Sequence, residues 1–159
     1  MKKSKPFKLV VFHLEEQKFA IHLSNVEQVT HSVQIKSLSI SPHYIAGTVN
    51  IQGEILPVIS VRGFLNFPMR EIELTDHFIV VKSTNMRMVL WVDSADDIVT
   101  ISEEEIEESR NNIVDSSYVE GIFKLRNGIV MINDLNKFLT HEQMSRLSLE
   151  LVKQISGNN

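Results

Sequence analysis

Short apolar runs separated by polar turns recur along most of the chain, and apolar residues at helical spacing dominate only near its end. The runs are rich in β-branched residues, which favours strands over helices. The predicted strands lie at residues 7–14, 19–21, 45–51, 55–61, 77–82, 87–93, 98–101, 119–125 and 129–132. Strands this short and closely spaced are typical of small barrels or sandwiches, so we expect a mainly β fold.

The runs 45–51 and 55–61 are joined by Gln-Gly-Glu at 52–54, a pattern that predicts a β-hairpin. Pro57 stands in the second arm. Because proline has no N–H to donate, we expect that arm to lie at a sheet edge or to carry a bulge near Pro57. The hairpin contains no nucleophile, phosphate-binding loop or metal ligand set, and an edge with a turn suits a docking module.

The two ends and one internal stretch break the strand pattern. Residues 1–6 are lysine-rich and are predicted to form a disordered lead. The polar stretch 68–76 is expected to connect two halves of a domain that covers residues 7–140. Residues 141–159 are predicted to form a C-terminal helix and tail that pack on the barrels. The apolar stripe of this helix consists of Met144, Leu147, Leu151 and Ile155, widened by Val152.

Composition excludes several classes of protein. The 159 residues are 43% hydrophobic and 23% charged, which is ordinary for one globular domain or two small barrels with a shared core. The net charge of −4 argues against non-specific nucleic-acid binding, which needs a basic face. There is no cysteine, and no run approaches the ~20 apolar residues of a membrane helix. We therefore expect a cytoplasmic protein without disulfides, a nucleic-acid partner or direct membrane insertion.

Histidines offer no clear metal site. The six histidines are dispersed, and none forms an i,i+4 pair on a predicted helix. His13 and His77 lie beside apolar strand residues and are expected to be satisfied barrel histidines. His22 and His31 are candidates to approach one another across a turn. We predict no resident metal ion or cofactor.

Asp93, Asp96 and Asp97 form the one tight acidic cluster that a hydrolase or a cation site could use. Asp93, however, is expected to end a strand, and the other two fit a turn. No G-x-S-x-G, dinucleotide or P-loop pattern occurs in the sequence. The sequence therefore favours a protein-binding module over an enzyme.

An ordered set of motifs resembles the CheW-type chemotaxis coupling proteins. Residues 45–62, Ile-Ala-Gly-Thr-Val-Asn-Ile-Gln-Gly-Glu-Ile-Leu-Pro-Val-Ile-Ser-Val-Arg, are similar to the family's G-V-x-N-L-R-G-x-(I/V)-(I/L)-P-(I/V)-(I/V)-D-L-R run. Further matching segments lie at 9–14, 19–21, 26–29, 92–99, 118–122 and 132–139. The resemblance spans roughly Phe7 to Thr140.

The resemblance implies a fold of two intertwined five-stranded, SH3-like barrels. It implies a non-catalytic adaptor that links the regulatory domain of the histidine kinase CheA to the cytoplasmic tip of chemoreceptors, at membrane-associated receptor arrays. A receptor helix would dock by its apolar face into the groove between the barrels, and edge strands of one barrel would contact the kinase. The positions that match the groove are Val26, Gln28, Gly47, Gln52, Gly53, Ala95 and Ile98.

Three positions depart from the family pattern. Gln52 stands where the family usually has Arg, Gln28 where it often has Glu, and Ser60 where it has Asp. We hypothesise that a neutral hydrogen bond between Gln28 and Gln52 replaces the family's charge pair. Because charges at a rim influence specificity and association rate, partner choice would then change.

Two alternative functions stay open on the sequence. One is a CheW-like scaffold in another signalling complex that contains no chemoreceptor. The other is a small ligand-binding or cation-binding β-barrel, or an enzyme, that uses the region of Asp93, Asp96 and Asp97. No receiver domain is expected after the barrels.

Overall fold

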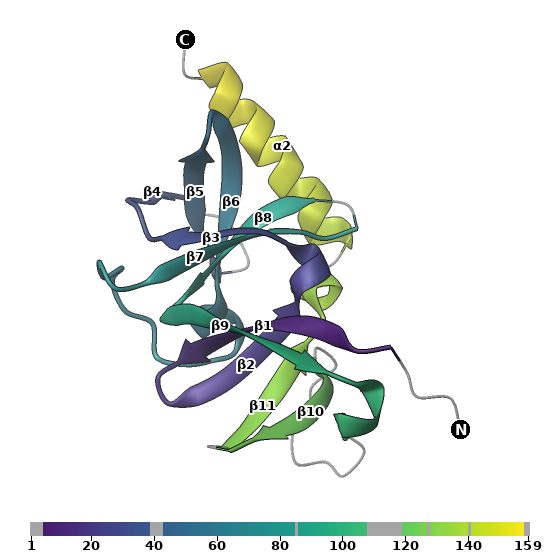
Figure 1. The fold of residues 1–159 in the computed structure, drawn as a ribbon. Coiled ribbons are helices and arrows are strands. Elements are labelled where there is room, and N and C mark those ends of the chain that lie inside the picture. The colour runs from purple at the N-terminus through teal and green to yellow at the C-terminus, as the bar shows by residue number, and fades with distance from the viewer. Residues whose placement is uncertain are drawn as a thin grey trace.

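Two β-sheets and one long C-terminal helix make up the protein (Figure 1). The structure is a computed structural model that describes residues 5–38, 43–84, 86–107, 119–126, 128–139 and 141–157. Of the lead predicted over residues 1–6, residues 1–4 lie outside this described part. Within the described residues, no helix is long and apolar enough to cross a membrane.

The first sheet has five strands in the order β10-β11-β2-β1-β9. They are β1 (Phe7–Leu14), β2 (Gln17–His22), β9 (Ser94–Ile101), β10 (Val119–Leu125) and β11 (Gly128–Asn133). β1 and β2, which correspond to the strands predicted at residues 7–14 and 19–21, form a buried antiparallel hairpin with Val11 opposite Ala20. β11 joins β2 in parallel, with Met131 opposite Phe19.

The second sheet has six strands in the order β3-β7-β8-β6-β5-β4. They are β3 (Val26–His31), β4 (Lys36–Ser37), β5 (Ile45–Ile51), β6 (Glu54–Ser60), β7 (His77–Lys82) and β8 (Arg87–Val92). One of its two edge strands, β4, has only two residues. The predicted mainly β fold of two barrels followed by a helix is confirmed, with this short sixth strand added to the second barrel.

The two sheets are intertwined, because the chain builds β1 and β2 of the first, then all of the second, and then returns for β9 to β11. It crosses between the sheets at the short 3-10 helix η1 (Leu23–Asn25) and at Asp93. The sequence suggested that the stretch 68–76 joins two halves of the domain, and the structure contradicts this. The stretch links α1 (Val61–Phe64) to β7 within the second sheet, since β8 lies between β6 and β7 and the chain must pass its end.

The largest hydrophobic cluster draws on both sheets. Phe12 and Ile21 come from the first sheet, Ile59 and Leu90 from the second, and all four are fully buried. Burying one such side chain stabilises a fold by about 1.5–3 kcal/mol, so this shared cluster holds the sheets against each other. Two smaller clusters fill the sheets' remaining inner faces separately.

The predicted C-terminal helix is α2 (His141–Gly157), which lies beside β6 (Figure 1). Leu147 is buried in the shared core and Leu151 is half-buried against it. Val152 is 60% exposed, so the prediction that it widens the packed stripe is wrong. Each residue turns the helix by about 100°, so Val152, one position after Leu151, lies on a side of the helix that does not face the core. The side chains of Met144 and Ile155 lie outside the described part.

Pro57 is tolerated in an interior strand, which the sequence did not predict. β6 lies between β5 and β8, not at an edge. The parallel ladder with β8 begins only at Val58, so no β8 partner is required at Pro57. An irregularity does occur close by, but on the facing strand, where the register of β5 shifts between Ile45 and Gly47.

Candidate functional site

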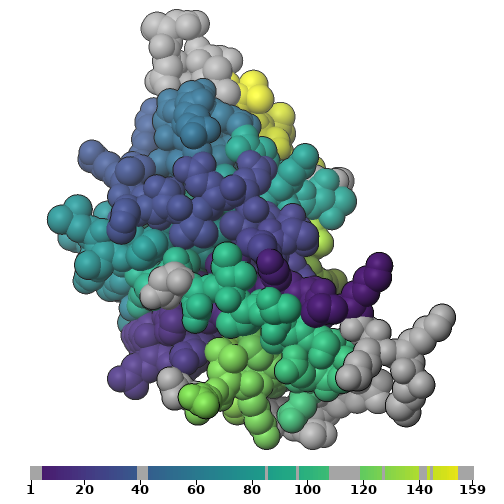
Figure 2. Space-filling model, in the orientation of Figure 1, coloured from purple at the N-terminus to yellow at the C-terminus, as the bar shows by residue number. Residues whose placement is uncertain are grey.

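A groove of about 350 Å³ lies between β3 of the second sheet and β9 of the first. Figure 2 shows the face of the molecule on which these two segments approach each other. The groove is lined by Val10, Leu23, Val26, Glu27, Gln28, Val29, Ala95, Asp97 and Ile98. Six of these nine side chains are aliphatic, so the groove can receive an apolar surface such as one face of a helix.

Both walls of the groove carry a β-bulge. In β3 the register with β7 shifts between Val26 and Gln28, which leaves Glu27 as the extra residue. In β9 the register with β1 passes from Asp97 to Ala95 and leaves Asp96 unpaired. A bulge re-aims the neighbouring side chains and is common beside functional sites. The two bulges allow consecutive residues of each strand to line the same groove.

The structure brings four of the seven predicted site residues together. Val26 and Gln28 on one wall, and Ala95 and Ile98 on the other, all line the groove. Ala95 is buried in its floor, whereas Ile98 is 57% exposed at its rim. The predicted residues Gly47, Gln52 and Gly53 do not line the groove but lie on the β5–β6 hairpin.

Five lining residues were missed in the sequence. They are Val10, Leu23, Glu27, Val29 and Asp97. The spacing of Leu23, Val26 and Val29 at every third position was the available signal, because it places three aliphatic side chains along one side of η1 and β3. No sequence pattern could indicate that β9 would lie opposite them.

The β5–β6 hairpin closes with a two-residue turn. Gln52 and Gly53 both have positive φ, 52° and 88°, and the Gly53 N–H donates to Asn50 Oδ1 at 2.8 Å. Gly47 serves a different purpose, since a Cβ there would lie 2.0 Å from the Lys36 carbonyl oxygen. The absence of a side chain at Gly47 therefore lets β4 pair with β5.

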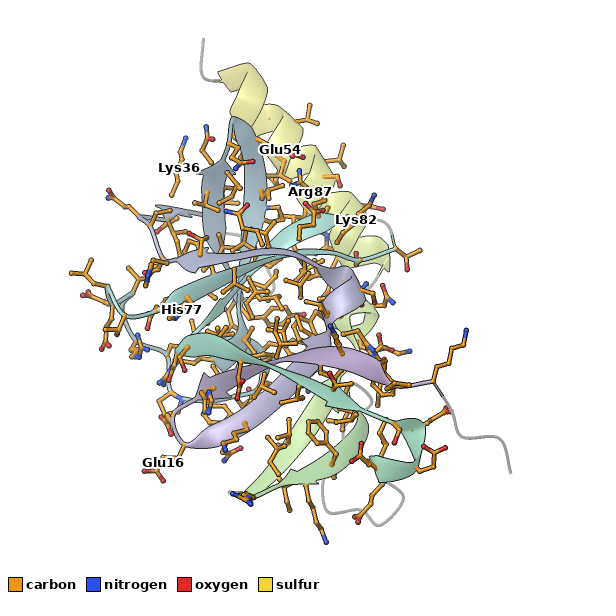
Figure 3. All side chains as sticks on the ribbon, in the orientation of Figure 1. Glu16, Lys36, Glu54, His77, Lys82 and Arg87 are labelled. Carbon is orange, nitrogen blue, oxygen red and sulfur yellow. The ribbon has the colours of Figure 1, made fainter. Side chains whose placement is uncertain are left out.

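The hypothesised hydrogen bond between Gln28 and Gln52 is not formed among the described residues. The charged contact in this region belongs to neighbouring positions. Arg87 donates to both oxygens of Glu27, at 2.8–3.2 Å, and its Nη1 atom forms an ion pair with Glu54 (Figure 3). A charged triad thus stands beside the two amides.

A second charged network lies where the chain crosses from β8 to β9. Arg62 donates to Asp93 from Nε at 2.8 Å and from Nη2 at 2.6 Å. Arg70 donates to Asp93 at 3.0 Å and to the fully buried Asp76 at 2.7 and 2.8 Å. The indole N–H of Trp91 also donates to Asp76, at 2.9 Å. Two arginines therefore neutralise two carboxylates with little solvent around them.

Asp93 connects this network to both sheets. Its carboxylate accepts from the backbone N–H of Glu15 at 2.8 Å, and its own N–H donates to the His13 carbonyl at 3.1 Å. Both contacts lie at the β1–β2 end of the first sheet, whereas Arg62 lies in α1 after β6. The network thus fixes how the two sheets are joined.

The network also fixes protonation states. Burial by itself would raise the pKa of Asp93, but hydrogen bonds from Arg62 and the Glu15 N–H, with the nearby arginine charges, lower it below its ordinary value. The pKa of Asp76 is lowered in the same way, with burial outweighed chiefly by its hydrogen bonds, first from Arg70. Carboxyls held ionised in this manner stabilise structure and are poor general acids.

The acidic cluster of the sequence does not form a common site. Asp93 is engaged by Arg62 and Arg70, whereas Asp97 lies at the groove. Asp96 and Asp97 belong to β9, so the prediction that they form a turn is wrong, and the Asp96 side chain lies outside the described part. Within the described residues, no group of three or more histidine or acidic side chains is placed to hold a metal ion.

The histidines are separated by the topology. His22 Nε2 lies 2.8 Å from Glu120 Oε2, and this hydrogen bond raises the pKa of His22 against the opposing effect of burial. β3 carries His31 into the other sheet, beside His77 with ring centroids 5.1 Å apart, so the expected approach of His22 and His31 is wrong. The Nδ1 atoms of His13 and His77 are buried without a hydrogen-bond partner among the described residues, so the expectation that both are fully satisfied is also wrong.

Comparisons with known proteins identify a matching family model, similar sequences and a similar structure. The family model for the CheW-like domain matches residues 8–143. The chemotaxis protein CheW of Bacillus subtilis is 29% identical over 85% of this chain and 88% of its own length. The chemotaxis protein CheW of Thermotoga maritima is 22% identical over 85% and 89%. The crystal structure of the scaffolding protein TtCheW from Thermoanaerobacter tengcongensis superposes with a TM-score of 0.76 and 28% identity, covering 84% of this chain and 92% of that one.

Proposed function

The chain belongs to the CheW-like domain family, and from this premise we propose that it is a non-catalytic adaptor that couples chemoreceptors to the histidine kinase CheA. The observation that carries the proposal is the aliphatic groove between β3 and β9. It lies between the two barrels, where the family resemblance assigns receptor docking. The site offers apolar contact area and amide or carboxylate side chains, which suits protein recognition rather than bond-making chemistry.

A helix of the chemoreceptor's cytoplasmic tip would lie with its apolar face in this groove. Val26 and Ala95 would form the floor contacts, and Ile98 would close over the helix from the rim. Gln28 would offer an amide to the helix's polar flank. Aliphatic side chains from two different strands give such a helix contacts at successive turns, which is the usual basis of helix-in-groove recognition.

The β5–β6 hairpin would supply the second part of the docking surface. Gln52 and Gly53 are exposed at its turn, and the lack of a side chain at Gly53 keeps the backbone accessible. Gly47 would contribute indirectly, by allowing β4 to pack against the hairpin. All seven residues that match the family's groove thus have a place in this proposal.

The kinase's regulatory domain would bind elsewhere, at edge strands of one barrel. Strand edges present unpaired backbone groups that a partner sheet can complete. Holding a receptor and a kinase on different surfaces would let the chain work as an adaptor in a receptor array. The ionised network around Asp93 supports the non-catalytic assignment, since its carboxylates are bound by arginines and directed inward.

The test is the affinity of purified protein for a receptor-tip fragment and for the CheA regulatory domain, measured by titration calorimetry. Ile98→Asp should weaken receptor binding by about tenfold or more, because it places a charge on an apolar contact. Ile129→Asp is the matched control, since Ile129 is 55% exposed on β11, away from the groove. Neither variant should change kinase binding or the melting temperature.

Absence of binding to both partners at tens of micromolar would refute the adaptor proposal. Binding to a kinase domain without binding to any receptor tip would favour the alternative of a CheW-like scaffold in another signalling complex. Equal loss of receptor affinity in both isoleucine variants would remove the groove from the proposal.

A further inference from the structure

Arg87 joins two strands that are not neighbours in the second sheet. Its guanidinium donates to Glu27 on β3 from Nε, at 3.1 and 3.2 Å, and from Nη2, at 2.8 Å. Its Nη1 atom pairs with Glu54, the first residue of β6 (Figure 3). β7 separates β3 from β8, so Arg87 reaches across a whole strand to contact Glu27. One side chain therefore ties β3 to the start of β6.

Each carboxylate of the triad adjoins the docking surface. Glu27 lines the groove itself and is the extra residue of the β3 bulge, next to Val26 and Gln28. Glu54 follows the turn residues Gln52 and Gly53 directly. The triad thus connects the groove wall to the hairpin turn.

The turn is shaped locally but positioned by the triad. Its conformation follows from two positive φ angles and from the bond between the Gly53 N–H and Asn50. None of these features fixes where the turn lies relative to β3. The ladder that joins β6 to β8 begins only at Val58, so it does not extend to the turn. Beside the turn, the contacts of Arg87 with Glu54 and Glu27 supply that constraint. A guanidinium that bonds both oxygens of a carboxylate is held in orientation as well as distance.

We propose that Arg87 is a positioning residue that holds the Gln52–Gly53 turn in register with the groove, so that one docked helix contacts both. This inference rests on the proposed function. Beside the triad, the amide of Gln28 lines the groove and the amide of Gln52 is exposed at the turn. The helix recognised here would therefore present hydrogen-bonding groups, rather than a fixed charge, to the amides.

The first variant is Arg87→Met, which keeps the aliphatic stem and removes the guanidinium. All three triad side chains are partly exposed, so their ion pairs contribute little to folding and the variant is expected to fold. Receptor-fragment affinity should fall by about fivefold to tenfold, the scale of coupling between neighbouring residues. Affinity for the kinase regulatory domain should not change. Arg126→Met is the matched control, because it removes the same charge from the exposed turn between β10 and β11.

A charge-inverted triad separates positioning from charge recognition. In the triple variant Glu27→Lys/Glu54→Lys/Arg87→Glu, the two ion pairs between strands can re-form with opposite charges. Recovery of receptor affinity to within about twofold of wild type would support a positioning role. Amide chemical shifts of Gln52 and Gly53 should move in Arg87→Met and return toward wild type in the inverted triad.

Two results would overturn the inference. One is wild-type receptor affinity in Arg87→Met. The other is an inverted triad that binds as weakly as Arg87→Met although its Gln52 and Gly53 shifts are restored, which would mean that the partner reads the charges themselves. Failure of the wild-type protein to bind the receptor fragment would instead refute the proposed function, so the two failures are distinguishable.

Discussion

Arg62 and Asp93 form a two-point ion pair at the junction of the two sheets, with donor–acceptor distances of 2.8 and 2.6 Å. The Arg62 side chain is only 10% exposed, and that of Asp93 18%. Arg62 belongs to the hairpin motif that ends at residue 62, whereas Asp93 stands 31 positions further along the chain. Their contact links the motif to the point at which the chain re-enters the first sheet.

Asp93→Asn is expected to lower the free energy of unfolding by about 3 kcal/mol, because it leaves two arginines beside a largely buried neutral group. Urea denaturation at neutral pH measures this loss. Glu16→Gln, which removes an exposed carboxylate next to Glu15, is the control and should change stability by less than about 0.5 kcal/mol. A loss of that small size in Asp93→Asn would show that the network does not hold the sheets together.

Gly47 and Gly53 should respond differently to alanine. Gly47→Ala places a methyl group on the Lys36 carbonyl oxygen and must displace β4, so a loss of about 2–3 kcal/mol is expected. Gly53→Ala meets no atom within 4 Å and suffers only the strain of a positive φ, about 1 kcal/mol. Thermal denaturation of both variants gives the comparison, and equal losses would contradict it.

The contact between His22 and Glu120 predicts a pH-dependent contribution to stability. Because the folded-state pKa of His22 is raised above its ordinary 6.5, the contact stabilises the protein fully below that value. The contribution is lost as the pH rises through the folded pKa. Glu120→Gln should therefore destabilise the protein more at about pH 5.5 than at about pH 8.5, by less than about 1 kcal/mol because both side chains are partly exposed. Melting temperatures at the two pH values test this, and a loss independent of pH would rule it out.

The neutral amides of Gln28, in the groove, and Gln52, at the hairpin turn, predict that these two positions add little salt dependence to receptor binding. The double variant Gln28→Glu/Gln52→Arg restores the charges that the family resemblance implies at these positions. Its receptor affinity should differ from that of wild type and fall more steeply as salt is added. Titrations at low and high ionic strength measure both quantities, and the two single variants show which charge is responsible. Affinity and salt dependence equal to wild type would mean that the amides do not set specificity.

The local elements followed from the sequence where a short stretch decides its own structure. The β5–β6 turn is one case, because Gly53 accepts a positive φ and the flanking residues favour strands. The C-terminal helix α2 is another, since the helical spacing of Leu147 and Leu151 is visible without any partner. Val26, Gln28, Ala95 and Ile98 were placed in the groove only through resemblance to a family, because nothing local relates β3 to β9.

Tertiary structure alone decided which elements meet. Pro57 lies inside a sheet because the β8 ladder begins one residue later, a register that the sequence of β6 does not contain. Glu27 contacts Arg87, whereas the hypothesised contact between Gln28 and Gln52 does not form among the described residues. The bulge in β3 and the strand order β3-β7-β8-β6 set which side chains can touch. The sequence by itself determined the strands, the turns and the apolar faces, since these depend on neighbours along the chain. The groove and the charged triad beside it depend on contacts between residues distant in sequence. These contacts are fixed only when the two sheets pack around their shared core.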